Sequence, residues 1–192
     1  MDAAFFDRPA ATVAAELIGH VLLVGGVGGA IVETEAYDRT DPASHSFAGP
    51  TKRNASMFGP PGRAYVYRSY GLHWCLNLVC APGSAVLLRA LAPTRGLDTM
   101  RARRGLDDPR RLCAGPGRLA QALAIDCLHD GVPTDRAPFA WGAPEGPVSV
   151  AATTRIGITK GAETPWRFLL AGSPFVSRPL PRRSLLPPAP SS

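Results

Sequence analysis

The sequence lacks an apolar segment long enough to cross a membrane. A spanning helix needs about 18 or more consecutive apolar residues, and the best candidate, HVLLVGGVGGAIV, is interrupted by four glycines. The N-terminal segment, MDAAFFDRPA, has an acid at position 2 and no basic stretch ahead of an apolar one, so we expect no secretory signal. These absences predict a protein without a membrane partner that stays inside the cell, in the bacterial cytoplasm near the nucleoid or in a eukaryotic nucleus.

Cysteines are few, and their spacing is unlike that of a metal site. The four cysteines include no CxxC pair, and the closest two, Cys75 and Cys80, fall in an alternating apolar stretch that is typical of a strand. Zinc binding and disulfide pairing are the alternatives to reduced thiols. The spacing favours reduced thiols in the core.

Lysine is nearly missing, although the chain is basic. Arginines outnumber lysines by 19 to 2, and the formal net charge is +6. Residues 51–125 carry a net charge of +9 and the remainder carries −3, which predicts that the middle segment binds a polyanion. The planar guanidinium group also favours bidentate contacts with phosphate. The alternative is a solvated basic face that reflects only an arginine-rich composition.

The length of 192 residues, with 45% hydrophobic residues, predicts one domain with its own core. We place this domain at residues 1–177, and we expect the Pro- and Arg-rich tail, residues 178–192, to be disordered. One helix is expected after a capping Asp7, and another after a capping Thr94.

Several segments predict strands. HVLLV and AIVETEAY flank GGVGG and predict a hairpin; a phosphate-binding loop is excluded because no Lys-Ser/Thr pair follows. RAYVYRSYGLHWCLNLV predicts two strands joined by a turn at or near Tyr70. Further strands are expected in SAVLLRALAP, PVSVAATTRIGIT and PWRFLLAG. The segment AGPGRLAQALAI predicts a helix, and the first turn of this helix could hold a phosphate with the help of Arg118. The long loop between the two hairpins, residues 38–63, suggests a functional segment.

The strand IVETEAY places two carboxylates and an aromatic ring on one side. Because side chains alternate between the faces of a strand, Glu33, Glu35 and Tyr37 are expected to point the same way. A glutamate near a strand end is, by itself, commonly solvated or paired with an arginine. A tyrosine at a turn tip in the most basic part of the chain, Tyr70, suits a wedge that enters a base stack. Tyr37 and Tyr67 could then hold an extruded base between them.

Five segments follow one another along the chain: IVETEAY, SHS, KRNASMFGPPGRAYVYRSYGLHWCLN, VLLRALAP and CAGPGRLAQAL. In this order they resemble the alkyladenine-type 3-methyladenine DNA glycosylases, or methylpurine DNA glycosylases. The resemblance runs from about Phe5 to Ser177. It implies a single α+β domain with a curved antiparallel β-sheet, surrounding helices and a protruding β-hairpin. It also implies double-stranded DNA as the partner, no metal and no organic cofactor, and we expect a monomer.

The resemblance implies a role for each matching side chain. Glu35 matches the base that activates the attacking water, and Arg89 matches an arginine near that water and the target nucleotide's phosphate. Tyr37, His45 and Tyr67 match the residues that hold the flipped base. Asn77 matches the residue that screens the purine's exocyclic group. Tyr70 matches the tyrosine that intercalates into DNA. The arginines that we predict to contact DNA phosphates are Arg53, Arg68 and Arg118. The chain departs from the family pattern in a shorter spacing between Tyr37 and His45 and in Lys52, where a proline is expected.

The resemblance predicts a monofunctional glycosylase that starts base excision repair. Such an enzyme flips alkylated or deaminated purines (3-methyladenine, 7-methylguanine, hypoxanthine or ethenoadenine) out of duplex DNA and hydrolyses the N-glycosidic bond. One alternative is a glycoside hydrolase that uses Glu33 and Glu35 as its carboxylate pair, but it gives no role to the basic segment. The other is a non-catalytic DNA-binding module, which needs no carboxylate facing the pocket.

Overall fold

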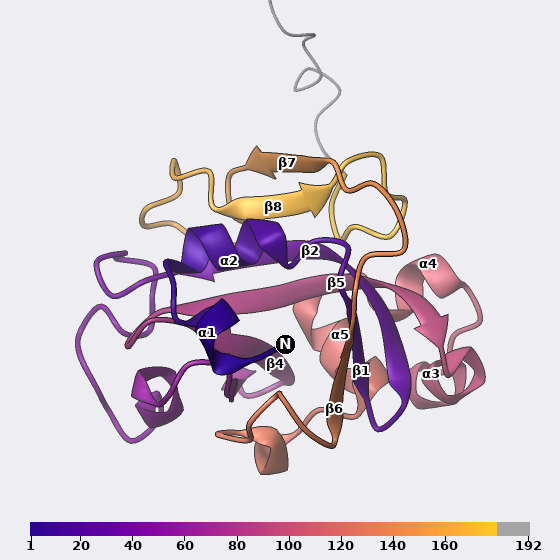
Figure 1. The fold of residues 1–192 in the computed structure, drawn as a ribbon, viewed down its shortest axis with the longest axis horizontal. Helices are drawn as coiled ribbons and strands as arrows, with labels where there is room; N and C mark the ends of the chain where they lie inside the picture. Colours follow the sequence, from indigo (N-terminus) through magenta and orange to yellow (C-terminus); the bar gives the residue numbers. More distant parts are fainter. Residues whose placement is uncertain (180–192) are drawn as a thin grey trace, which may run out of the picture.

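Two long antiparallel strands, β2 (Val27–Tyr37) and β5 (Ala85–Arg95), form the centre of the fold (Figure 1). They belong to an eight-stranded sheet in the order β3-β4-β5-β2-β1-β6, and β8 pairs with both β2 and β7. The remaining strands are β1 (Val21–Val24), β3 (Ala64–Ser69), β4 (His73–Val79), β6 (Phe139–Gly142), β7 (Val150–Thr153) and β8 (Arg167–Leu170). All strand pairs are antiparallel and the sheet curls into a half-barrel, which confirms the predicted α+β fold with a curved antiparallel sheet.

The structure is a computed structural model in which residues 1–179 are described. Among these residues, no helix is long and apolar enough to cross a membrane. The predicted tail, residues 178–192, lies outside the described residues except for its first two positions, so the boundary between domain and tail stays a prediction. The carbonyl of Arg178 accepts a hydrogen bond from Arg167.

The helices lie at the ends and on the faces of the sheet (Figure 1). They are α1 (Ala3–Phe6), α2 (Ala10–Glu16), α3 (Leu97–Arg104), α4 (Pro109–Leu112) and α5 (Pro116–Leu123), with 3₁₀ turns η1 (Ala55–Phe58) and η2 (Cys127–His129). The predicted caps are wrong for two of them. Helix α2 begins after Pro9 rather than at Asp7, and α3 begins after Gly96 because β5 runs on through Thr94. Pairing of β5 with β2 outweighs the capping preference of a threonine.

The glycine-rich segment is a hairpin turn, as predicted. Gly25 and Gly26 join β1 to β2 with φ values of +57° and +81°, a left-handed conformation that glycine adopts readily. Gly29 meets a second demand, since a Cβ there would lie 1.9 Å from the carbonyl oxygen of Ala92 on β5. The glycines therefore allow β2 to lie close to β5 and form one continuous strand up to Tyr37.

Strand β2 is anchored from both sides. The hydroxyl of Thr34 donates to the carbonyl of Ala14 in α2 at 2.8 Å, while Glu33 and Glu35 point to the opposite side. Helices α2 and α5 share one apolar core with the strands, and its fully buried side chains include Leu17, Ile31, Leu76, Leu88 and Leu119. A smaller cluster of Met57, Tyr65, Val79 and Ala85 packs against Tyr37 and Tyr67. This cluster fixes the place where the two tyrosines leave the sheet.

The β3–β4 hairpin carries an aromatic ring at its tip, as predicted. Tyr70 has a φ of +50° in the turn and is 91% exposed, and its neighbour Leu72 is 70% exposed. Large aromatic and aliphatic side chains are more often buried than exposed. The tip of this hairpin therefore presents an unusual apolar surface to solvent.

The cysteines differ from the prediction at one position. Cys75, Cys80 and Cys113 are free and buried, and burial raises the pKa of Cys80 and Cys113 to about 12. Cys127 is free but exposed at the start of η2, so it is not a core thiol. In residues 1–179, no group of three or more His, Cys, Asp or Glu side chains could hold a metal ion.

Candidate active site

A cavity of about 530 Å³ opens between the end of β2, the β3–β4 hairpin and β5. Most of the side chains that the sequence predicted for the site line this cavity: Tyr37, His45, Arg53, Tyr67, Arg68, Tyr70, Asn77 and Arg89. Further lining comes from the segment of residues 156–158, between β7 and β8. Residues from distant parts of the sequence thus meet at one hollow beside the exposed hairpin tip.

Aromatic rings form one wall of the cavity. The ring centroids of His45 and Tyr67 are 4.4 Å apart, in an edge arrangement, and those of Tyr65 and Tyr67 are 5.5 Å apart. The Nδ1 atom of His45 lies 2.8 Å from the hydroxyl oxygen of Tyr65. Burial raises the pKa of Tyr67 and of Tyr65, so both phenols stay neutral at physiological pH. Such a wall offers flat apolar surfaces to a planar ligand.

Tyr65 is a site residue that the sequence analysis missed. It is almost fully buried, packs against Tyr67 and holds His45 through its hydroxyl group. Its position two residues before Tyr67 puts it on the same face of β3, which is the signal that could have identified it.

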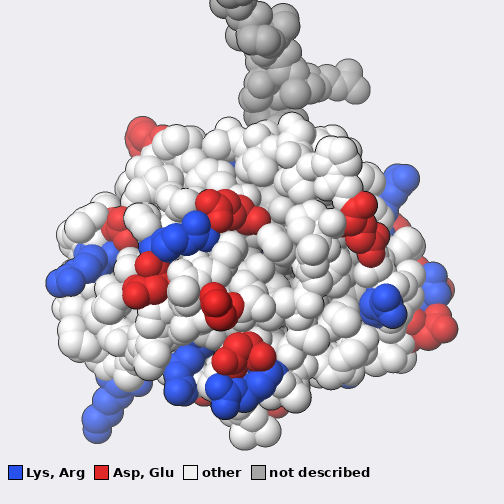
Figure 2. Space-filling view, in the orientation of Figure 1, with Lys and Arg blue, Asp and Glu red and all other residues white. Residues whose placement is uncertain are grey.

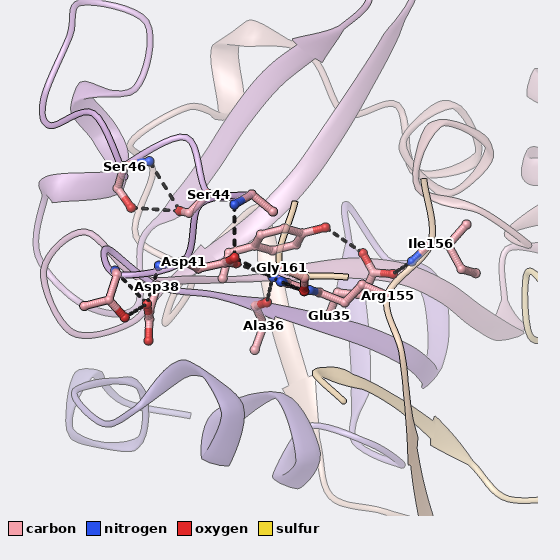
Figure 3. Close-up of polar contacts among 12 residues, drawn as sticks. Glu35, Ala36, Asp38, Asp41, Ser44, Ser46, Arg155, Ile156 and Gly161 are labelled. Carbon is pink, nitrogen blue, oxygen red and sulfur yellow. Dashed lines mark hydrogen bonds and ion pairs between the residues drawn. The ribbon is translucent and has the colours of Figure 1, made fainter. Parts of the chain in front are cut away.

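Glu35 lies behind the wall of the cavity, with none of its surface exposed. Its Oε2 atom accepts hydrogen bonds from the hydroxyl of Tyr37 at 2.8 Å and from Nη1 of Arg89 at 3.2 Å. Its Oε1 atom accepts the backbone N–H of Ile156 at 2.7 Å (Figure 3). All three donors belong to residues that line the cavity, so Glu35 is one side chain away from the open space. This enclosure was not predicted from the sequence.

Arg89 connects the two carboxylates of β2. Its Nε atom donates to Glu33 at 3.1 Å and its Nη1 atom donates to Glu35. Burial lowers the pKa of Arg89, but the charges of Glu35 and Glu33 raise it by more, so the pKa is raised overall and the guanidinium remains a cation. The guanidinium thus bridges two buried carboxylates and leaves neither without a cationic partner.

Glu33 is enclosed and accepts four hydrogen bonds. It accepts from Arg89, from Nε of Arg167 at 2.7 Å, and from both the backbone N–H and the hydroxyl of Ser177. Three of these bonds end on Oε1 and one ends on Oε2. Glu33 therefore holds Arg89 and the segment after β8 in place.

Asn77 and the predicted phosphate-binding arginines occupy different parts of the site. The buried Asn77 on β4 lines the cavity and donates from Nδ2 to the carbonyl of Tyr65 at 3.0 Å. Arg53 and Arg68 are exposed and line the same cavity, and Arg68 lies on β3 two residues before Tyr70. Arg118 is exposed on α5 and lines a second cavity of about 590 Å³.

The second cavity adjoins the first, because Arg89, Pro116 and Ile156 line both. Its remaining lining includes three arginines, Arg104, Arg118 and Arg178, and the imidazole of His73. By contrast, the face over α1 and α2 mixes acidic and basic side chains (Figure 2). Arg118 was predicted from the sequence as a phosphate contact, whereas Arg104 and Arg178 were not.

The acid–base behaviour of His45 gives a testable consequence. Burial, and then the charge of Arg53, lower the pKa of His45 from 6.5, although part of its surface remains exposed. The unfolded chain therefore binds this proton at higher pH than the folded protein does. We expect the contribution of His45 to stability to be complete above pH 6.5 and to be lost as pH falls through the lowered pKa. Between pH 5 and 7.5, the urea midpoint of unfolding should fall less steeply with decreasing pH in His45→Gln than in the wild type. The same dependence on pH in both proteins would contradict a lowered pKa of His45.

The fold and the cavity can now be compared with known proteins. The family model described as Methylpurine-DNA glycosylase (MPG) matches residues 4–174. The chain belongs to the methylpurine-DNA glycosylase family. The chain is 61% identical to a protein of Rhodopseudomonas palustris over 181 residues, covering 93% of this chain and 88% of the relative. It is 62% identical to one of Rhizobium meliloti over 177 residues, covering 92% and 96% of the two chains. Both relatives carry the name "Putative 3-methyladenine DNA glycosylase".

Membership in the methylpurine-DNA glycosylase family confirms the resemblance drawn from the sequence. It makes the protein a DNA glycosylase, an enzyme whose substrate is DNA, as predicted. The match covers the strands, the hairpin and the cavity described above, and it ends shortly before Ser177, which the sequence analysis took as the end of the domain.

Proposed function

We propose that the protein is a monofunctional DNA glycosylase that excises alkylated or deaminated purines and thereby starts base excision repair. Its substrates would be 3-methyladenine, 7-methylguanine, hypoxanthine and ethenoadenine in double-stranded DNA. The observation that carries this proposal is the link from Glu35 to the cavity through Tyr37 and Arg89. A base enclosed by aromatic rings there would have a carboxylate directly behind one of them.

Glu35 has the capacity to activate water. A carboxylate has about four acceptor positions, and three of them are occupied by Tyr37, Arg89 and Ile156. The remaining position, on Oε1, can accept a proton from a water molecule next to the sugar. Cleavage of an N-glycosidic bond passes through a cationic, oxocarbenium-like sugar, so the same negative charge stabilises the transition state.

Selectivity would depend on both the leaving group and the fit of the base. A purine alkylated at a ring nitrogen is already cationic and leaves without further protonation, whereas hypoxanthine is neutral and must gain a proton. Asn77, buried at the cavity with its amide tied to Tyr65, is the side chain placed to reject an unsuitable exocyclic group. A site with fixed polar groups discriminates against ligands that leave those groups unpaired.

The geometry argues against a glycoside hydrolase. That mechanism needs a second carboxylate free to act as acid, base or nucleophile. Glu33 is instead held by four hydrogen bonds, and two of its partners are the cations Arg89 and Arg167. The pairing of Glu33 and Glu35 on one face of β2 thus serves to orient Arg89.

Base release from defined duplexes tests the proposal. Four duplexes of one sequence, carrying hypoxanthine, ethenoadenine, 7-methylguanine or an undamaged purine at one position, would be incubated with excess enzyme. We expect release of free base from at least one damaged duplex and at most trace release from the undamaged control. Absence of release from all three damaged duplexes, with DNA binding intact, would refute the proposed activity on these three bases.

The strand should remain intact after the base has gone. Cleavage of the backbone by a glycosylase requires an amine that forms a Schiff base with the sugar. The only lysines are Lys52 and Lys160, both exposed, and neither is among the described residues lining the cavity. We expect sodium borohydride to trap no covalent complex and strand breaks to appear only after alkali. An adduct lost in Lys52→Ala or Lys160→Ala would show that the nucleophile is an amine.

The predicted phosphate contacts should appear in the salt dependence of binding. The logarithm of affinity falls with the logarithm of salt concentration by about 0.9 per phosphate contact. Replacing Arg53, Arg68 or Arg118 with alanine should therefore reduce the slope by about 1 each. Arg136→Ala is a matched control, because Arg136 is exposed but paired with its neighbour Asp135 at 2.8 Å. A slope unchanged by all three replacements would remove these arginines from the interface.

The location and assembly of the protein also remain predictions. The relatives named above are bacterial, and we propose that the protein acts on chromosomal duplex DNA in the bacterial cytoplasm, as a monomer.

A further inference from the structure

Arg155 is a buried cation next to the cavity that the mechanism above does not use. Its side chain has 0% exposed surface and lies just after β7. Its Cζ atom is 4.7 Å from the centre of the Tyr37 ring and 5.4 Å from that of Trp166. Because Tyr37 lines the cavity while Arg155 is enclosed, the guanidinium packs on this ring from the protein side.

The guanidinium group is bound on three sides. Both of its Nη atoms donate to the carboxylate of the buried Asp41, forming a bidentate pair (Figure 3). Nη1 also donates to the carbonyl of Ala36 at 3.0 Å, and Nη2 donates to that of Gly161 at 3.0 Å. The Nε atom has no hydrogen-bond partner among the residues that the structure describes. An unpaired Nε atom and two buried charges are costly for stability, so stability alone does not account for this arrangement.

Gly161 shows that the surrounding chain is shaped around this ion pair. It has a φ of +58°, and a Cβ at this position would lie 2.8 Å from Oδ1 of Asp41 and 3.2 Å from Nη2 of Arg155. An alanine would therefore push against both partners, in addition to the strain of the left-handed backbone.

The ion pair joins three segments that each deliver a side chain or backbone group to the site. Ala36 precedes Tyr37, whose hydroxyl donates to Glu35. Asp41 lies in the loop that carries His45. Arg155 itself precedes Ile156, whose N–H donates to Glu35 at 2.7 Å. A shift of the Arg155–Asp41 pair would thus move two of the three hydrogen-bond donors to Glu35 at once.

From this geometry we infer that Arg155 is a positioning residue of the glycosylase reaction: with Asp41, it fixes the Tyr37 ring and the Ile156 N–H, and these two donors hold the Glu35 carboxylate in its orientation behind the cavity. The inference rests on the proposed function. Arg155 should affect the rate of the chemical step, because that step depends on the placement of reacting groups to within about an ångström. It should have little effect on DNA binding, because its side chain is enclosed.

Removing only one partner would leave an unpaired buried charge and could unfold the protein. The double variant Arg155→Met, Asp41→Leu removes both charges and keeps apolar volume, and such replacements of buried pairs are often neutral for stability. We expect this variant to keep its melting temperature and its affinity for lesion duplex to within about threefold. Its single-turnover excision rate should fall by about 10- to 100-fold, the effect of a misplaced reacting group.

A second pair of variants tests the same inference without altering either charge. Gly161→Ala should lower the excision rate while leaving duplex affinity unchanged. Gly172→Ala is its control, because Gly172 has a φ of +75° but a Cβ there would have no neighbour within 4 Å. Wild-type excision rates in both the double variant and Gly161→Ala would overturn the role of Arg155 while leaving the proposed function intact. A wild-type enzyme that releases no base would instead refute the proposed function itself, and with it this role.

Discussion

Replacing Glu35 with glutamine should lower the single-turnover rate of base excision by at least about 10²-fold, the lower end of general-base contributions. The charge that activates water and stabilises the sugar cation is lost. Lesion-duplex affinity should largely persist, because Glu35 is enclosed behind Tyr37 and Arg89 and presents no surface to DNA. Rates would be measured with enzyme in excess over a hypoxanthine-containing duplex.

The enclosure of Glu35 makes stability controls necessary. Glutamine places an NH₂ group against Tyr37 and Arg89 or against the N–H of Ile156, all of which are donors. Thermal melting of the variant must therefore accompany the rates. The variant Glu33→Gln changes the neighbouring carboxylate and disturbs its bond with Arg89. The variant Glu16→Gln is the inert control, because Glu16 pairs with Arg8 on the surface. A folded Glu35→Gln enzyme with near-normal excision would remove Glu35 from the role of base.

Replacing Tyr70 with alanine should sharply reduce the fraction of extruded bases. Stacking of a base on an aromatic ring contributes roughly 1–3 kcal/mol, so we expect the flipped fraction and the lesion affinity to fall by about tenfold. The fold should survive, since Tyr70 is 91% exposed. The fluorescence of ethenoadenine in duplex DNA, which depends on its stacking, would report the change.

Tyr70→Phe is the matched variant, because it keeps the ring and removes only the hydroxyl group. It should behave like the wild type in the same fluorescence titration. If Tyr70→Ala flips the base as well as Tyr70→Phe does, the ring does not act as a wedge.

The sequence predicted the local features of the site well. The period-two pattern of IVETEAY placed Glu33, Glu35 and Tyr37 on one side of β2, and the hydrogen bonds of Arg89 and Tyr37 confirm that arrangement. The turn at Tyr70 followed from the alternation of the flanking strands. These features depend on neighbouring residues, whose relative placement the strand geometry determines.

Features that depend on distant contacts were not predicted. The Arg155–Asp41 pair joins residues 114 positions apart, and the N–H of Ile156 reaches Glu35 across 121 positions. No spacing rule links such residues, because their contact follows from the pairing of β8 with β2. For the same reason, the enclosure of Glu35 behind the cavity wall could not be foreseen from β2 alone.

The most direct test of the account is a crystal structure of the Glu35→Gln enzyme bound to a duplex that contains one hypoxanthine or ethenoadenine. We predict that the damaged base lies in the 530 Å³ cavity against Tyr37, with the ring of Tyr70 in the gap left in the base stack. A damaged base that remains stacked within the duplex, or a duplex bound on a face remote from the β3–β4 hairpin, would contradict the account.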